Sequence, residues 1–142
     1  MEGFQPDLLA VLLAALAGFV IGGLWYSPVL LGEMWQKEAG ITEEQIASGN
    51  KARIFGTTFV ALLIMSYCLE MFIGPTAEAA EGFFSPSQQG AFYGFLTGFG
   101  WIFFALVVVG MYEQRSMKYI MVNGGYWIVT MTAMGGILGG MG

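Results

Sequence analysis

Four long stretches without charged side chains constrain this chain more than any other feature of its sequence. They cover residues 8–32, 54–73, 82–112 and 119–142, and Glu70 is the one carboxylate within them. Each stretch is rich enough in apolar residues for a helix of about 20 residues, the length that crosses a bilayer. The sequence therefore predicts an all-α integral membrane protein with one domain over residues 1–142. We expect a bundle of four transmembrane helices at about 7–26, 53–73, 88–112 and 119–141.

The composition supports this class and argues against several others. Hydrophobic residues make up 56% of the chain and charged residues 11%, too few to cover the surface of a soluble domain. The net charge of −5 and the lack of a basic run argue against nucleic acid as a partner, because phosphates need clustered lysine and arginine. With no histidine and a single cysteine, we expect no metal site and no cofactor. We expect membrane lipid to surround the protein.

The positions of the basic residues predict the orientation in the membrane. All five lie in two of the three connections: Lys37, Lys51, Arg53, Arg115 and Lys118. The third connection holds two glutamates and no base. Because lysine and arginine gather on the cytoplasmic side, we expect loops 27–53 and 113–118 in the cytoplasm and both termini outside. A signal peptide is the alternative for the first helix, but Glu2 and Asp7 stand where it would need basic residues.

The first connection has an organisation of its own. Pro28 ends the first helix because it removes a backbone donor and restricts the residue before it. Trp35 suits the headgroup layer and indicates a short interfacial segment. Thr42 and Gln45 have the spacing of a capping box, which predicts a further short helix that closes at residues 49–50.

Small residues recur at every fourth position in three of the four stretches. They are Ala14, Gly18 and Gly22 in the first, Gly90, Gly94 and Gly98 in the third, and Gly135, Gly136, Gly139 and Gly140 in the fourth. Such stripes let membrane helices approach closely. Two interpretations stay open: the stripes pack helices within one chain, or they also form an interface in a homo-oligomer. The second stretch has few small residues, so we expect it to face lipid or to pack through larger side chains.

Two polar side chains within the apolar stretches are candidate ligand-binding groups. Glu70 is a candidate for a proton or cation site, although its place near the outer end of its stretch also allows contact with headgroup water. Asn123 lies early in the fourth stretch and can donate and accept hydrogen bonds, either to a neighbouring helix or to a polar ligand.

A set of residues near the first connection and in the last helix resembles a known family. The set comprises Trp25, Tyr26, Ser27, Pro28, Gly32 and Trp35, together with Asn123, Gly125 and Tyr126. This pattern resembles the bacterial membrane protein family called domain of unknown function 1761. The resemblance implies a four-helix inner-membrane protein and adds Tyr126 to the candidate polar residues, but it supplies no catalytic residue and no cofactor.

Three classes of function are compatible with these features to different degrees. A self-assembling transporter or channel for a small solute or ion accounts for both the small-residue stripes and the polar groups in the membrane. An accessory or scaffold subunit of a larger membrane complex is the alternative, and would bring a membrane-protein partner. We do not expect an enzyme, because the sequence has no phosphate-binding loop and no base near Cys68.

Overall fold

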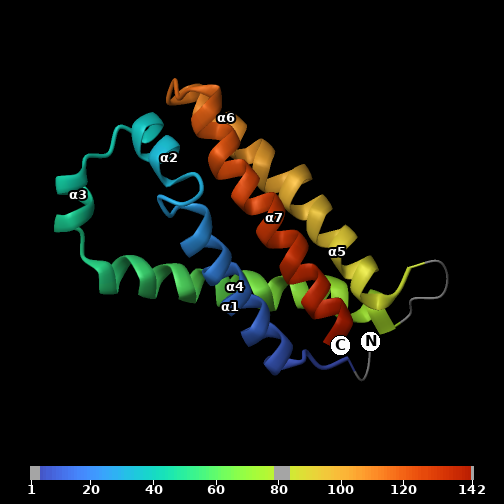
Figure 1. Cartoon of the computed structure of the whole chain (residues 1–142). Helices are drawn as coiled ribbons and strands as arrows, with labels where there is room; N and C mark the ends of the chain where they lie inside the picture. The colour runs from blue at the N-terminus through green and yellow to red at the C-terminus, as the bar shows by residue number, and fades with distance from the viewer. Residues whose placement is uncertain (1–3, 79–83, 142) are drawn as a thin grey trace.

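The computed structural model describes residues 4–78 and 84–141, and this part of the chain is helical (Figure 1). The elements are α1 (Leu8–Trp25), α2 (Gly32–Ala39), α3 (Glu43–Ser48), α4 (Lys51–Glu78), α5 (Pro86–Thr97), the π-helical segment η1 (Gly98–Phe103), α6 (Phe104–Tyr112) and α7 (Met117–Met141). Since α5, η1 and α6 follow one another without a break, they form one rod. Residues 79–83 of the predicted acidic connection lie outside the described residues, and so do residues 1–3 and 142 of the predicted domain.

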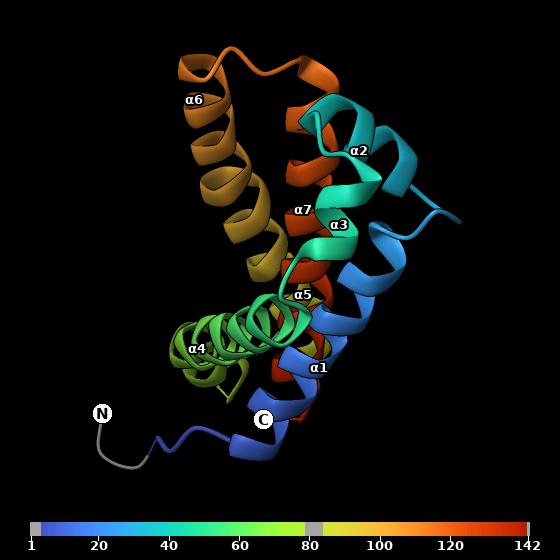
Figure 2. The same ribbon diagram turned by 90° about the vertical axis from the view of Figure 1, so that its left-hand side faces the viewer.

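Three helical rods run along a common direction, and α4 passes across them. In both views α1, the α5–η1–α6 rod and α7 lie lengthwise, with α7 antiparallel to the other two, whereas α4 crosses them steeply (Figure 1, Figure 2). The start of α1 and the end of α7 lie at one end of the molecule, and α2 and the α6–α7 turn lie at the opposite end (Figure 2). The expected bundle of four aligned helices is therefore only partly what the structure shows.

Three helices are long and apolar enough to cross a membrane, judged by length and composition. They are Leu8–Trp25, Lys51–Thr76 and Pro86–Tyr112. The fourth predicted span, α7, is not among them, because its many glycines contribute little hydropathy although the helix carries only one charge, on Lys118. Large apolar side chains such as Leu16, Phe72 and Phe104 are exposed on the outer faces of the other helices, where a lipid environment would accept them.

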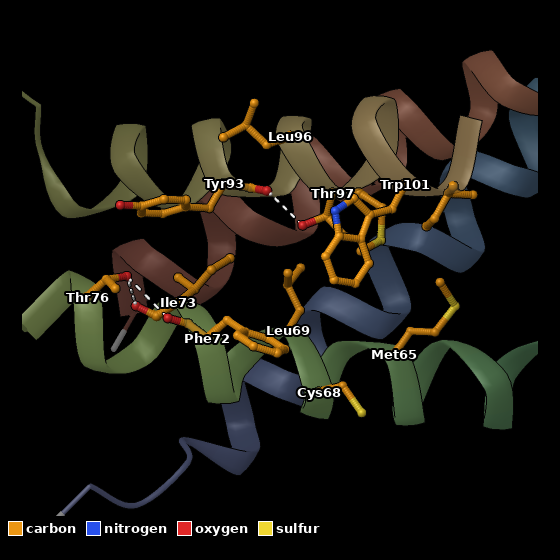
Figure 3. A pocket seen from close by; sticks show the side chains of 12 residues that line it. Met65, Cys68, Leu69, Phe72, Ile73, Thr76, Tyr93, Leu96, Thr97 and Trp101 are labelled. Carbon is orange, nitrogen blue, oxygen red and sulfur yellow. Dashed lines mark hydrogen bonds between the residues drawn. The ribbon is translucent and has the colours of Figure 1, made fainter. Parts of the chain in front are cut away.

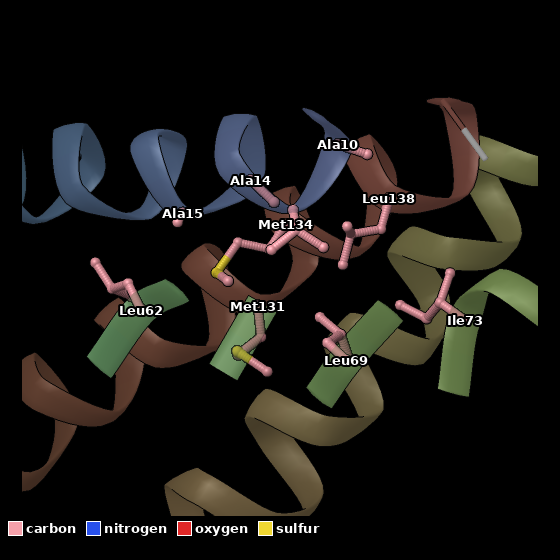
Figure 4. Packing of buried hydrophobic residues seen from close by; sticks show 10 residues of the cluster. Ala10, Ala14, Ala15, Leu62, Leu69, Ile73, Met131, Met134 and Leu138 are labelled. Atoms are coloured by element: carbon pink, nitrogen blue, oxygen red, sulfur yellow. The ribbon is translucent and has the colours of Figure 1, made fainter. Parts of the chain in front are cut away.

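The core forms where α1 and α4 meet α7. Met134 and Leu138 of α7 are fully buried between Ala10 and Ala14 of α1 and the α4 side chains that include Leu69 (Figure 4). Helix α7 also packs against α2, α5, η1 and α6, so it is the central element of the fold. The low hydropathy of α7 is consistent with its central position, because a helix surrounded by other helices needs close contact more than it needs lipid-facing side chains.

Glycines of the α5–η1–α6 rod and of α7 lie directly against each other. A Cβ atom built on Gly90 would overlap the carbonyl oxygen of Gly135, and one built on Gly94 would overlap the carbonyl oxygen of Met131. A Cβ on Gly98 would lie 2.7 Å from the carbonyl oxygen of Trp127. The two backbones therefore approach so closely that no side chain fits between them at these positions.

The remaining predicted small residues also face neighbours within the chain. Gly139 lies against the carbonyl oxygen of Pro86, and Gly136 and Gly140 lie beside Ser87. On α1, Ala14 is fully buried, Gly18 faces Leu62, Thr130 and Met134, and Gly22 faces the ring of Tyr126. The small-residue stripes therefore have packing partners within one chain.

Helix α4 packs through larger side chains, which is one of the two arrangements that the sequence predicts for this segment. Leu62, Leu69 and Ile73 contribute to the core, whereas Gly56 has no neighbouring atom within 4 Å of an added Cβ. These bulky side chains fill the space where α4 crosses the other helices. It also continues past residue 73, through Pro75.

The capping box predicted in the first connection is confirmed. The hydroxyl of Thr42 accepts a hydrogen bond of 3.1 Å from the Gln45 amide, and the Gln45 side chain accepts one of 2.8 Å from the Thr42 amide. The same device begins α5, where Ser85 and Gln88 exchange bonds of this kind. The sequence predicts the start of this helix at about residue 88, two residues later, because the cap was not recognised.

Candidate functional site

The residues that carry the family resemblance meet in one cluster at the end of α1. The chain turns sharply after α1: the Ser27 hydroxyl donates to the Leu24 carbonyl at 2.7 Å, and the Gly32 amide donates to the Ser27 carbonyl at 2.9 Å. A Cβ on Gly32 would overlap the carbonyl oxygen of Tyr26 and lie 2.6 Å from that of Ser27. Only glycine therefore allows α2 to begin so close to the end of α1.

The turn is held against α7 by two side-chain hydrogen bonds. The indole N–H of Trp25 donates to the carbonyl oxygen of Val122 at 2.9 Å. The hydroxyl of Tyr26 donates to Oδ1 of Asn123 at 2.7 Å, and Nδ2 of Asn123 donates to the Tyr119 carbonyl of its own helix at 3.1 Å. Both polar atoms of the Asn123 amide thus have partners, which gives this residue a role in helix packing.

Aromatic rings fill the rest of this motif cluster. The ring of Tyr26 packs against Trp35 at 5.4 Å and against Tyr126 at 5.6 Å between centroids. The hydroxyl of Tyr126 donates to the carbonyl oxygen of Gly18 at 2.9 Å, deep inside the protein. Burial, followed by the neighbouring phenol groups of Tyr126 and Tyr119, raises the pKa of Tyr26, which follows the last residue of α1. Tyr26 therefore stays a neutral hydrogen-bond donor.

We expect Tyr26→Phe to destabilise the protein by about 1–2 kcal/mol, because the substitution keeps the ring and leaves Oδ1 of Asn123 without its donor. Thermal unfolding in mild detergent would measure the change. Tyr112→Phe is the matched control, since Tyr112 is 87% exposed and lies outside the cluster. Equal melting temperatures for the two variants would show that the Tyr26–Asn123 bond contributes nothing to stability.

Glu70 lies at the other end of α1, so the structure does not bring it together with Asn123. Its side chain is 1% exposed, and its Oε2 accepts a hydrogen bond of 3.2 Å from the backbone amide of Asp7, the residue before α1. One turn earlier on α4, Ser66 donates to the carbonyl oxygen of Val11 at 2.8 Å. Glu70 and Ser66 therefore attach α4 to the start of α1.

A cavity lies between α4 and the α5–η1–α6 rod (Figure 3). Its volume is about 480 Å³, within the range of about 300–1,000 Å³ that is usual for ligand pockets. Apolar and aromatic side chains line it, with a few polar atoms: Met65, Cys68, Leu69, Phe72, Ile73, Thr76, Tyr93, Leu96, Thr97, Trp101, Ile102 and Met131. None of these residues carries a charge. We refer to this cavity as the α4–α5 groove.

Three of the polar groups in the groove come from one side of the α5–η1–α6 rod. The hydroxyl of Thr97 donates to the carbonyl oxygen of Tyr93 at 2.9 Å, one turn earlier. Trp101 follows in η1, and its indole ring extends from the rod toward α4 (Figure 3). A π-helical segment within an α-helix is often found at functional sites, because it changes the direction of the side chains that follow.

Analysis of the sequence did not find the groove. Its residues come from α4, α5, η1 and α7, and none belongs to a recognisable motif. The one available signal was Trp101, an amphipathic ring near the middle of a stretch in which aromatic residues are expected nearer the interfaces.

The helical architecture, the three membrane-length helices and the apolar outer surface define a helical membrane protein. The chain belongs to the family described as protein of unknown function (DUF1761), whose model matches residues 9–139. That span includes both halves of the motif cluster and confirms the resemblance. Among curated proteins and solved structures, no match to the chain is found.

Proposed function

We propose that this protein is a small membrane transporter for neutral amphipathic solutes. The α4–α5 groove carries this proposal: it is large enough for a small molecule, it is lined by uncharged side chains, and part of its wall is exposed on the apolar outer surface. A solute with an apolar body can enter such a groove from the bilayer. An ion gains little there, because transferring a charge into apolar surroundings is costly without a partner.

The crossing of α4 supports this proposal. If α4 lay along the α5–η1–α6 rod, side chains would close the space between the two helices. Instead α4 meets α1 and α7 through Leu62, Leu69 and Ile73, and diverges from the rod elsewhere (Figure 1). The groove therefore lies between one helix fixed to the core and one rod fixed to α7, and a change in the angle of α4 would alter its width.

For the topology, we propose four spans, with α7 as the fourth, both termini outside and the two basic connections in the cytoplasm of a bacterium. Contacts between these connections support their lying on one side. Arg115 donates to the carbonyl oxygen of Ala39 at 3.3 Å, and the hydroxyl of Ser116 donates to Oε1 of Glu38 at 2.6 Å. Lysine and arginine favour the cytoplasmic side of the membrane.

The transport proposal is tested in proteoliposomes with a fluorescent, neutral amphipathic probe, with glucose and potassium as polar comparisons. We expect the protein to speed passage of the amphipathic probe at least several-fold over empty vesicles, and to leave the polar solutes unaffected. Leu96→Trp, which fills the groove at a position 43% exposed, should abolish the increase.

Leu24→Trp is the matched control, because Leu24 is 58% exposed on α1 and lies outside the groove. It should transport like the unmodified protein. Rates equal to those of empty vesicles for every solute would contradict the proposal, and so would equal rates for the two tryptophan variants.

An accessory or scaffold subunit is the second candidate, and the exposed face of the α5–η1–α6 rod favours it. Of the three membrane-length helices, Pro86–Tyr112 has the smallest buried share, 11%, so helices of a partner have room to pack there. Native mass spectrometry after gentle extraction separates the cases. A fixed foreign partner would favour the accessory role, and a homo-oligomer would favour self-assembly of the transporter.

Our proposal assigns no enzymatic activity to the groove. Cys68 is the one thiol in its lining, and the lining residues include no carboxylate, lysine or histidine that would activate it as a nucleophile.

A further inference from the structure

We infer that the α4–α5 groove binds a neutral apolar molecule that carries carbonyl oxygens, which accept hydrogen bonds from the side chains of Trp101 and Tyr93. This inference rests on the proposed function, since it names the class of solute that the same groove would take. The evidence for it is whether the hydrogen-bond donors that line the groove have acceptors within the protein.

Two donors in the groove have no acceptor among the described residues. The indole N–H of Trp101 makes no hydrogen bond to this part of the chain, in contrast to that of Trp25, which is bonded to Val122. The hydroxyl of Tyr93 likewise has no partner there, in contrast to those of Tyr26 and Tyr126. Two tyrosines and one tryptophan of the motif cluster are thus bonded, and the donors of the groove are not.

The position of Trp101 makes an unbonded donor costly. It lies near the middle of the Pro86–Tyr112 span and is 75% exposed on the surface that faces lipid or ligand. Acyl chains offer no acceptor at this depth, and a polar group without a partner is disfavoured in hydrocarbon. A ligand oxygen in the groove would remove this cost, so binding gains free energy that plain acyl chains cannot supply.

The local helix geometry directs Trp101 into the groove. Residues Gly98–Phe103 form η1, and the wider π-helical turn shifts the following side chains around the rod relative to an α-helix. Trp101 and Ile102, both in η1, line the groove. The ring of Trp101 extends toward α4 (Figure 3).

The lining defines the class of ligand. Because no lining residue is charged, a charged headgroup would find no counter-ion in the groove. The donors Trp101 and Tyr93 require acceptors, and the surrounding Phe72, Leu69 and Met65 require an apolar body. A neutral carbonyl compound meets both requirements. Two membrane sources have this chemistry, ester lipids without a charged headgroup and lipid-soluble quinones.

Binding is tested with the whole protein in mild detergent by the rise in melting temperature with added ligand, since a ligand that binds only the folded state stabilises it. The probes are a decyl-substituted benzoquinone, a neutral diacylglycerol, and hexadecane as an apolar molecule without acceptors. We expect one of the two carbonyl compounds to bind more tightly than hexadecane. Which one does so identifies the source.

Two isosteric variants test the donors. Trp101→Phe and Tyr93→Phe each remove a donor and keep an aromatic ring, and each should weaken binding of the carbonyl probe about five- to ten-fold. Their affinity for hexadecane should stay unchanged, which distinguishes a lost hydrogen bond from a damaged groove. Tyr112→Phe, outside the groove, should bind all probes like the unmodified protein. Native mass spectrometry of the same samples counts the bound molecules.

Affinities of both groove variants within two-fold of the unmodified protein would overturn the inference, and so would equal binding of hexadecane and the carbonyl probes. These outcomes are separable from a failure of transport. Donor-dependent binding without any flux in vesicles would leave this inference standing and refute the transporter. Flux that Leu96→Trp abolishes, but that is indifferent to Trp101→Phe and Tyr93→Phe, would do the reverse.

Discussion

Replacing Gly94 with alanine should destabilise the folded protein by about 3 kcal/mol, although alanine is the better helix former. The added Cβ would overlap the carbonyl oxygen of Met131 on α7, which is backbone and cannot turn aside as a flexible side chain can. The two helices would have to separate, and contacts at Gly90 and Gly98 would loosen with them. Thermal or denaturant unfolding in detergent micelles would measure the loss.

Gly100→Ala is the matched control on the same rod. An added Cβ at Gly100 has no atom within 4 Å, so this substitution should be neutral or stabilise by up to about 1 kcal/mol through helix propensity. The predicted changes in stability therefore have opposite signs for two glycines that lie six positions apart. Similar stability of the two variants would show that α5 and α7 do not approach as closely as the structure places them.

We expect Trp25→Ala to destabilise the protein by about 3 kcal/mol, because it removes both a hydrogen bond and a large packed ring. The indole nitrogen bonds to Val122, and the ring lies against Gly125, where an added Cβ would come within 3.0 Å of it. The loss should also free the turn to α2, which a protease could detect as faster cleavage in the first connection.

Trp101→Ala is the matched control, because it also replaces a tryptophan with alanine. Without ligand it should change stability by less than about 1 kcal/mol, because its ring is largely exposed and its N–H has no acceptor in the described part of the chain. Trp25→Phe, which keeps most of the ring and loses the N–H, should fall between the two. Equal stability of Trp25→Ala and Trp101→Ala would contradict the role of the motif cluster as the connection between α1 and α7.

Local patterns in the sequence were enough to predict the class of protein and most of the helix limits. Long uncharged stretches permit little besides membrane-length helices, because the backbone must satisfy its own hydrogen bonds in hydrocarbon. The cap at Thr42 was readable since a capping box depends on two residues three positions apart. The family resemblance was readable as well, because it rests on local motifs such as Trp25-Tyr26-Ser27-Pro28.

The way in which these helices meet depends on contacts between residues that are far apart in the sequence. Spacing alone left open whether Gly90 and Gly94 face a neighbouring helix or another subunit, and the answer depends on the position of α7. Likewise, nothing near Glu70 in sequence indicates that it accepts a bond from Asp7, because the two residues are 63 positions apart in the chain. The α4–α5 groove was beyond prediction for the same reason: its lining comes from four elements, and Trp101 lies in a π-helical turn that the sequence does not signal. Helix caps and short motifs depend on residues that are close together in the sequence, so they can be predicted from it. A cavity depends on how helices far apart in the sequence pack against each other.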